Sequence, residues 1–343
     1  MRFRLVTFAL VLVLVSGGQA YINKRRGHNK RRGHADRVAE ARSAKISAEV
    51  IENSQQTGTL RQGARGSAVV RVQILLDRAH FSCGEIDGDF GSNLQKAVAA
   101  FQEDRRLPVT GIVDDETWST LNADQAPALV SYVISPEDET GPFLPIPTDL
   151  VAQADLKSLG YSSPLEELAE RFHSSPAVLQ ALNSGADFTR AGQQLTVPNV
   201  LVLPPGQADR VVVSKSESSV RAYDASGKLL SFYAATIGSE HDPLPIGSWK
   251  VRGVSRNPVF HYNAQLFWDA DDKNAKAVIR PGPNNPVGLV WIDLSKEHYG
   301  IHGTPEPSRI GHATSHGCIR LTNWDALELA AMVKPGTAAI LQE

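Results

Sequence analysis

The chain has 343 residues, about twice the usual size of one domain, so two or three domains are expected. Hydrophobic residues make up 42% and charged residues 21%, which is ordinary for a globular protein. The formal net charge of -2 argues against a chain that is built as a whole to bind nucleic acid or an anionic membrane. We therefore expect no nucleic-acid partner.

Residues 1–20 have the order of a secretory signal peptide. A positive start, an apolar run and small residues at a cleavage spacing follow one another at Arg2, Arg4, Leu5–Val15 and Gly18–Ala20. The apolar run is shorter than the roughly 20 residues that a membrane span needs, so a cleaved signal is favoured over a permanent anchor. We expect an exported protein of the periplasm or cell wall.

Residues 21–59 are predicted to be a basic disordered tether. The sequence Asn-Lys-Arg-Arg-Gly-His occurs twice in tandem, at 23–28 and 29–34. Such a cationic stretch cannot bury apolar surface and is expected to stay solvated. On an exported chain an anionic envelope surface is its expected partner. A solvated tether that binds nothing is the alternative.

Residues 60–122 predict a small helical module. Ser67 is expected to cap a first helix, and a turn-rich loop at 84–91 separates it from a second helix. Asp115 opens a third, short helix. The apolar positions that share one face in these helices are Val69, Val72, Leu75, Leu76 and Ala79, then Leu94, Ala97, Val98 and Phe101, then Trp118 and Leu121.

This module resembles the three-helix peptidoglycan-binding domain, through Ile86–Gly91, Ala97–Gln102, Gly111–Val113 and Thr117–Leu121. The resemblance implies attachment to the cell wall without chemistry. Asp87-Gly88-Asp89 matches part of a calcium loop, but its closing glutamate is absent, so a turn is predicted. Cys83 stands where the family often has another residue, and we predict a structural role for it.

Residues 123–151 contain five prolines and are predicted to be a stiff linker. In residues 152–199, amphipathic helices are expected from Pro164 and Pro176, followed by a closing strand at Leu195–Pro198. This order, with Leu182-Asn183 and the Gly192 turn, resembles a LysM-type βααβ module, which implies glycan binding. A packing spacer is the alternative.

Residues 208–342 predict a β-rich domain with one helix near its end, at 325–332. The strand-like runs lie at 210–213, 219–223, 229–237, 247–254 and 288–294. Together with the helical modules, this makes the chain a multidomain α+β protein.

The clearest chemistry lies in Cys318 and His302. A free thiol has a pKa near 8.5, so a neighbouring base or cation must raise its thiolate share at neutral pH. A histidine titrates near neutrality and can act as that base. Further basic groups at His316 and Arg320 predict an electropositive setting. Gly317 lets the backbone turn tightly, so that successive amides face a developing oxyanion.

Zinc is the main alternative for these side chains, because histidine and cysteine are permitted ligands. The candidates follow no familiar ligand spacing, and His316 and Cys318 would point to opposite sides of an extended segment. We therefore predict no metal and no cofactor. A disulfide between Cys83 and Cys318 would consume the reactive thiol, so two free cysteines are expected.

The motif His302-Gly303-Thr304, followed by Ser315–Leu321, resembles the active-site signature of the L,D-transpeptidase (YkuD-type) catalytic domain. The likeness extends through Leu244–Gly247, Pro281–Pro286 and Lys334–Thr337. It implies a β-sandwich-like catalytic domain over residues 208–342. The wall-binding resemblances of the preceding modules agree with it.

Position by position, the resemblance makes Cys318 the nucleophile and His302 the general base, with the Gly303 carbonyl orienting the imidazole. His316 and Gly317, with the Cys318 amide, would shape the oxyanion site.

Two further residues keep open roles at this stage. Arg320 is suited to a substrate carboxylate, with a structural ion pair as the alternative. Ser315 either contacts substrate or holds the loop through backbone bonds. His312 inherits no role from the resemblance.

The implied reaction begins when the cysteine attacks the carbonyl of the third residue of a peptidoglycan stem peptide and expels D-alanine. An acceptor amine then attacks the thioester and forms a 3→3 cross-link or attaches a protein to the wall. Stem peptides and glycan strands are thus the expected partners. Two alternatives stay open: an L,D-carboxypeptidase that uses water as the acceptor, and a non-catalytic wall-binding protein.

Overall fold

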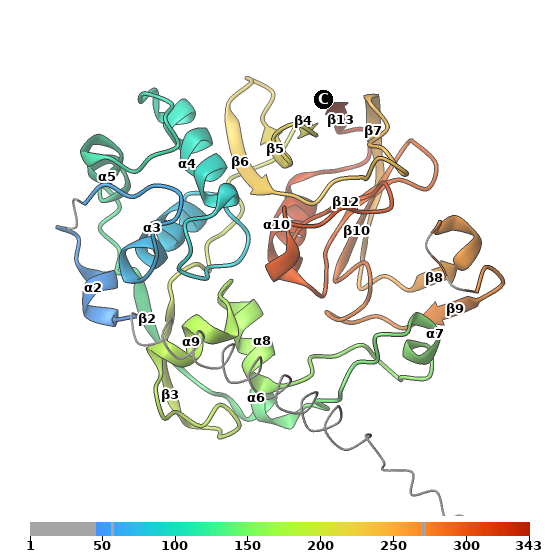
Figure 1. Ribbon diagram of the computed structural model, residues 1–343, viewed down its shortest axis with the longest axis horizontal. Helices are drawn as coiled ribbons and strands as arrows, with labels where there is room; N and C mark the ends of the chain where they lie inside the picture. Colours follow the sequence, from blue (N-terminus) through green and yellow to red (C-terminus); the bar gives the residue numbers. More distant parts are fainter. Residues whose placement is uncertain (1–45, 56–57, 269, 271) are drawn as a thin grey trace, which may run out of the picture. The chain divides into compact units, whose positions relative to one another are not determined.

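The structure, a computed structural model, describes residues 46–55, 58–268, 270 and 272–343 (Figure 1). The predicted signal peptide and the two basic repeats lie outside these residues. Within the described part of the chain, no helix is long and apolar enough to cross a membrane. All described residues belong to one compact unit.

The disordered tether predicted for residues 21–59 overlaps a folded segment. Helix α2 (Ala48–Glu52) is capped by Ser47, whose hydroxyl accepts a hydrogen bond from the Val50 amide. Ile51 is fully buried in a cluster that also contains Ile74. Because this apolar side chain has partners to pack against, the segment folds, and the prediction of a disordered chain here is wrong.

Residues 60–122 form the three-helix module, which contains α3 (Ser67–Arg78), β1 (Phe81–Ser82), α4 (Ser92–Arg105) and α5 (Asp115–Leu121). The predicted apolar faces meet in one buried cluster. The predicted cap is wrong: Gly66 is the N-cap of α3, with a φ of 100° that suits glycine, and Ser67 is already helical. The Ser67 hydroxyl instead accepts a hydrogen bond from the Ser47 amide.

Residues 129–198 form the middle module. Its elements are β2 (Leu129–Val133), α6 (Pro136–Thr140), α7 (Leu150–Gln153), α8 (Pro164–Arg171), α9 (Pro176–Leu182) and β3 (Gln194–Pro198). Strand β2 lies inside the predicted linker and pairs antiparallel with β3. The linker prediction is therefore wrong for this stretch, where alternate residues of β2 are buried or half-buried against the module.

A strand-helix-helix-strand order is thus present in the middle module, but it begins at Leu129 and not within 152–199. Residues 134–163, with two short helices, lie between its first strand and its first long helix. The prolines of this stretch led to the prediction of a linker, and strand β2 was therefore not predicted.

Residues 208–342 form the β-rich domain. Its elements are β4 (Arg210–Ser214), β5 (Ser219–Tyr223), β6 (Leu229–Ala234), β7 (Gly247–Arg256), β8 (Phe260–Asn263), η1 (Ala264–Leu266), β9 (Lys276–Ile279), β10 (Val290–Leu294), β11 (Gly300–His302), η2 (Pro307–Arg309), β12 (Ile319–Arg320), α10 (Asn323–Met332) and β13 (Ala338–Gln342). The five predicted strands and the predicted helix are all found; the strand at 219–223 has the predicted ends, and the others have shifted ends. The other strands of the domain were not predicted.

The main sheet has the strand order β1-β6-β5-β4-β13-β7-β10-β11-β12. Strand β7 bends the sheet, because its first residues pair with β13 and its later residues pair with β10. At the far edge, the backbones of Thr236 and Arg320 exchange two hydrogen bonds, of 3.0 and 2.9 Å. The last strand is therefore tied back to the segment that follows β6. Helix α10 packs into the core enclosed by these strands.

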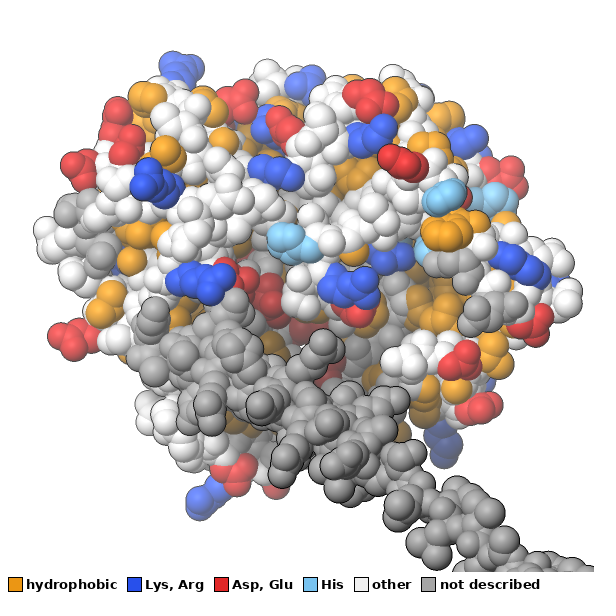
Figure 2. Space-filling model, viewed as in Figure 1, with side chains coloured by type: hydrophobic (Ala, Val, Ile, Leu, Met, Phe, Trp, Pro, Cys, Tyr) orange, Lys and Arg blue, Asp and Glu red, His pale blue; other side chains and the backbone are white. Residues whose placement is uncertain are grey.

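The three-helix module and the β-rich domain share structure. Strand β1 pairs in parallel with β6, and Phe232 of β6 is buried in the core of the three-helix module. The prediction of separate domains therefore needs this correction, because an edge strand of one supplies core to the other. On the face shown in Figure 2, Lys and Arg side chains are interspersed with Asp and Glu, and neither sign covers it.

Candidate active site

The pairing of two very short strands turns the predicted nucleophile and base to one face of the sheet. Strands β11 and β12 are parallel, with Ile301 opposite Ile319 and His302 opposite Arg320. Side chains alternate between faces along a strand, so His302, Arg320 and Cys318, which precedes β12, project to one face. Both isoleucines project to the other face and are fully buried in the domain core. The apolar partners thus fix the register of the polar face.

His302 is held in one orientation. Its Nδ1 lies 2.7 Å from the carbonyl oxygen of Gly303, and its ring stacks on Trp291 at a centroid distance of 5.4 Å and an interplanar angle of 16°. A carbonyl oxygen can only accept, so Nδ1 carries the proton and Nε2 is left as an acceptor. The orienting role predicted for the Gly303 carbonyl therefore has the required geometry.

The imidazole of His302 is neutral. The side chain is only 3% exposed. Burial and, to a smaller extent, the charge of Arg320 lower its pKa to about 3, although the hydrogen bond to Gly303 acts in the opposite direction. A neutral imidazole can accept a proton at any physiological pH.

The thiol of Cys318 is half-buried, and it donates a hydrogen bond to the carbonyl oxygen of His298 at 3.7 Å. Burial raises its pKa, a hydrogen bond from the Gly300 backbone and the charge of Arg320 lower it in part, and Asp242 raises it. The sequence predicted an electropositive setting that depresses this pKa. The opposite direction follows because the nearby His302 is neutral and desolvation dominates.

The loop before Cys318 is fixed by backbone contacts. The Ser315 amide donates to Ile237, and the Ser239 amide donates to the Ser315 carbonyl. The Ser315 hydroxyl is buried and lies 2.5 Å from the carbonyl oxygen of Cys318. Of the two roles left open for Ser315, this geometry favours holding the loop.

Gly317 occupies a position that only glycine suits. Its φ is 94°, and a Cβ there would lie 2.9 Å from Cε1 of Tyr299 and strain the backbone. Tyr299 comes directly before β11, so its ring packs the turn before β12 against the start of β11. The tight turn predicted beside the nucleophile is therefore confirmed.

His316 lies among aromatic side chains that the sequence did not point to. Its ring contacts Phe267 at a centroid distance of 4.9 Å and Trp268 at 6.2 Å. Trp268 also contacts His241 at 4.4 Å and remains 54% exposed. Phe267 and Trp268 come from the segment between β8 and β9, where no motif or periodicity marked them.

Arg320 makes no ion pair with any of the described residues, although it lies beside the thiol and is half-buried. Its Nε is buried and has no hydrogen-bond partner there. Burial lowers its pKa, yet a guanidinium keeps its charge. A structural ion pair, one of the two roles left open, is therefore not what this side chain forms.

The remaining candidates lie apart from this face. Cys83 and Cys318 are both free, and Cys83 is buried in the core of the three-helix module, where burial raises its pKa. His312 contributes to a pocket between that module and the β-rich domain. Among the residues that the structure describes, no group of three or more His, Cys, Asp or Glu side chains could hold a metal ion.

A thiol, an oriented neutral imidazole and a glycine carbonyl on one sheet face form the set of groups used in cysteine-dependent acyl transfer. Residues 208–341 match the L,D-transpeptidase catalytic domain family, and residues 65–121 match the peptidoglycan binding domain family.

Relatives of known name agree. A protein named L,D-transpeptidase YkuD from Bacillus licheniformis is 35% identical over 175 residues, which cover 50% of this chain and 90% of that protein. A protein named L,D-transpeptidase YbiS from Escherichia coli (strain K12) is 30% identical over 204 residues, which cover 56% of this chain and 66% of that protein. The solved L,D-transpeptidase from Xylanimonas cellulosilytica is 16% identical, covers 83% of this chain and 98% of that one, and has a TM-score of 0.36.

The chain belongs to the L,D-transpeptidase (YkuD) family, and its enzymatic class is L,D-transpeptidase. The β-rich domain is the catalytic domain of that family, and the helical region before it contains a peptidoglycan-binding domain.

Proposed function

We propose that Cys318 is the nucleophile and His302 the general base of this L,D-transpeptidase. The register of β11 and β12 supports this most directly, because it turns both side chains to one face. The Gly303 carbonyl keeps the proton on Nδ1, so that Nε2 can take the thiol proton. It thereby fills the part of the acid in a serine triad.

Proton transfer accompanies attack in this site. The resting thiol and imidazole are both neutral, as their pKa shifts require. The thiol therefore leaves the His298 carbonyl and gives its proton to Nε2 of His302 as sulfur bonds to the substrate carbonyl. Such hydrogen bonds often tighten only when substrate binds.

The first half-reaction takes a tetrapeptide stem. Sulfur attacks the carbonyl of the third residue, and the tetrahedral oxyanion is stabilised by backbone amides at Gly317 and Cys318, in the turn beside His316. Collapse breaks the peptide bond and expels D-alanine, whose amine receives the proton from His302. A thioester on Cys318 remains. An acceptor amine then attacks it and gives a proton to His302, which passes that proton to the released thiolate.

Arg320 binds a carboxylate of the stem peptide in this proposal. It is a half-buried cation without an ion pair among the described residues, its Nε is buried without a partner there, and it lies next to the reacting sulfur. A guanidinium in that state gains a charge-assisted hydrogen bond when an anion enters. Gly303 contributes through its backbone, and Ser315 contributes by shaping the loop.

Water is the competing acceptor. An enzyme that uses water would be an L,D-carboxypeptidase with the same nucleophile and base. Incubation with purified tetrapeptide muropeptides distinguishes the two: cross-linked dimers or an amine-coupled product support transfer, whereas tripeptide alone means hydrolysis. A non-catalytic wall-binding protein would leave the tetrapeptide unchanged.

The other modules are proposed to keep the enzyme at the wall. The peptidoglycan-binding family match supports this for the three-helix module. For the middle module, the β2-α8-α9-β3 order supports a LysM-like glycan contact. An enzyme with this substrate works outside the cytoplasm, in the periplasm or cell wall. Pull-down of the full chain with purified peptidoglycan sacculi tests the attachment, and a chain that stays in the supernatant contradicts it.

A further inference from the structure

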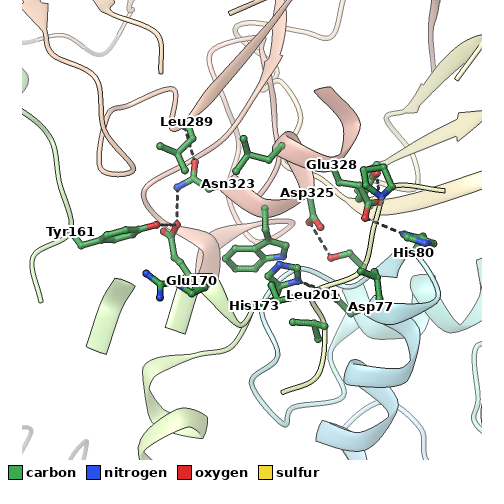
Figure 3. A pocket seen from close by; sticks show the side chains of 18 residues that line it. Asp77, His80, Tyr161, Glu170, His173, Leu201, Leu289, Asn323, Asp325 and Glu328 are labelled. Atoms are coloured by element: carbon green, nitrogen blue, oxygen red, sulfur yellow. Dashed lines mark hydrogen bonds and ion pairs between the residues drawn. The ribbon is translucent and has the colours of Figure 1, made fainter. Parts of the chain in front are cut away.

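Three parts of the chain meet around a cavity of about 350 Å³ (Figure 3). Its walls come from the three-helix module, from the middle module and from helix α10 with the segment before it. Polar pairs cross between these parts at 3.0 Å each: Asp77–His173, His80–Glu328, Ser82–Asp325 and Glu170–Asn323. The cavity thus lies where the modules meet, and its polar groups are hydrogen-bonded to one another across the module boundaries.

Asn323 differs from the other members of these pairs, because its amide also bonds to the backbone just before β10 (Figure 3). It is the first residue of α10 and is 2% exposed. Its Oδ1 accepts a hydrogen bond from the Leu289 amide at 3.1 Å, just before β10. Its Nδ2 donates to Glu170 of α8 at 3.0 Å and to the Pro283 carbonyl at 3.2 Å. The amide is therefore fixed from two modules.

The same amide oxygen lies against the peptide that orients the catalytic imidazole. A Cβ on Gly303 would lie 2.3 Å from Oδ1 of Asn323, and a Cβ on Gly288 would lie 2.1 Å from it. Only glycine permits this approach at both positions. Gly303 in turn supplies the carbonyl that holds Nδ1 of His302 at 2.7 Å. A shift of Asn323 therefore moves or frees the acceptor of the imidazole.

We propose that Glu170 and Asn323 are positioning residues for His302, so that the middle module sets the geometry of the catalytic base. This inference rests on the proposed role of His302. Glu170 accepts a hydrogen bond from Nδ2 of Asn323, the Asn323 amide packs closely against Gly303, and the Gly303 carbonyl orients the imidazole. A module expected only to bind the wall thereby acts on catalysis without touching the substrate.

The state of Glu170 suggests a conservative variant. Burial raises its pKa to about 8, with Glu166 and Glu85 raising it and the hydrogen bonds of Asn323 and Tyr161 lowering it. At pH 7 the group is mostly neutral, so glutamine in Glu170→Gln resembles the form that is present. Its amide oxygen still accepts from Asn323, whereas Glu170→Ala removes the acceptor.

The test is the acylation of Cys318 by a carbapenem, followed by intact-mass spectrometry at several inhibitor concentrations and pH 7. We expect Asn323→Ala to lower the maximal acylation rate by about 10²-fold and Glu170→Ala by roughly tenfold, because small misplacements of a catalytic group have effects of this size. The half-saturating concentration should change by no more than about twofold, since the relay does not touch the ligand. Glu170→Gln should keep the wild-type rate within about twofold.

Glu328→Gln is the matched control. It removes a cross-module ion pair on the same helix, α10, but Glu328 bonds to His80 and Tyr233 and does not reach Gly303. We expect its acylation rate, per labelled site, to stay at the wild-type value even if its melting temperature falls. If Asn323→Ala does not fold, the contrast between Glu170→Ala and Glu170→Gln decides.

Two results overturn the proposed positioning role. One is that Glu170→Ala and Asn323→Ala are acylated as fast as the wild type. The other is that acylation of Glu328→Gln is slowed as much as that of Glu170→Ala. The second would mean that weakening any contact between the modules slows acylation. A wild-type protein that a carbapenem does not label overturns the proposed function and the relay with it, so the two failures are distinguishable.

Discussion

The catalytic face and the cavity between the modules use burial of ionisable groups in different ways. On the face that carries Cys318 and His302, desolvation keeps both groups neutral, and both are hydrogen-bonded to the backbone. At the cavity, desolvation raises the pKa of Glu170 and Asp325, and both are bonded to another side chain across a module boundary. Desolvation thus leaves neutral groups available for proton transfer in one region, and in the other it accompanies hydrogen bonds that connect the modules.

The difference teaches that a strongly shifted pKa does not by itself mark a catalytic group. The two regions differ in the hydrogen-bond partners of their buried ionisable groups. Backbone carbonyls leave Nε2 of His302 and the sulfur of Cys318 available to a substrate. Side-chain partners in the cavity occupy the carboxyl groups. The predictions below test each half of this contrast.

The largest effect is expected from Cys318→Ala, which should abolish covalent labelling by a carbapenem in intact-mass spectra. The reason is that no other described thiol is accessible, Cys83 being buried. The matched control is Cys83→Ala, which should be labelled like the wild type. Persistent labelling of Cys318→Ala would remove the nucleophile from this account.

His302→Ala should slow acylation by about 10²- to 10⁴-fold, the usual contribution of a positioned base. In the wild type, the pKa of about 3 keeps His302 neutral, so the acylation rate should stay level as pH falls from 8 to 5. A rate that halves near pH 6.5 would show instead that the base titrates like a free histidine.

Slow alkylation is the matching prediction for the thiol. Because burial raises the pKa of Cys318, iodoacetamide should react slowly at pH 7 and faster as pH rises above 9. Fast alkylation at pH 6 would indicate a thiolate and contradict the neutral pair. A slow thiol is therefore no evidence for a non-catalytic protein.

Arg320→Gln should raise the KM for a tetrapeptide stem by roughly 10- to 100-fold, as the loss of a charge-assisted hydrogen bond to a carboxylate predicts. Its kcat should change less than its KM. Steady-state release of D-alanine measures both. A loss confined to kcat would mean that Arg320 acts on the reacting groups and not on binding.

The smallest effect concerns the cavity. The pKa of Glu170 is about 8 and that of nearby Glu85 is about 7 in the folded protein, above the ordinary value of about 4.5. Between pH 4.5 and 8 the folded state therefore binds more protons than the unfolded state, and stability falls as pH rises. Thermal unfolding should show a melting temperature some degrees lower at pH 8 than at pH 5. In Glu170→Gln the fall should be smaller, and an equal fall would contradict the assignment.

The sequence predicted the enzyme class because short motifs carry it. The roles proposed for Cys318, His302 and Gly317 come from these motifs, which can be recognised without knowing the strands on which they lie. Strands β11 and β12 have three and two residues, too few to show an alternation. Their pairing became visible only in the fold.

The sequence predicted the relations between modules poorly. Glu170 and Asn323 lie 153 positions apart, and each is an ordinary polar residue beside a helix pattern. Prolines suggested a linker where β2 forms, and composition suggested a tether where Ile51 packs. Contacts of this kind depend on tertiary packing, which local propensity does not encode.

The most direct test of the central claim is peptide mapping after incubation with a tetrapeptide muropeptide and rapid acid quenching. The account predicts an adduct on the peptide that contains Cys318, with the mass of the donor minus D-alanine, and none in Cys318→Ala. An adduct at another residue, or D-alanine release by Cys318→Ala at the wild-type rate, would contradict it.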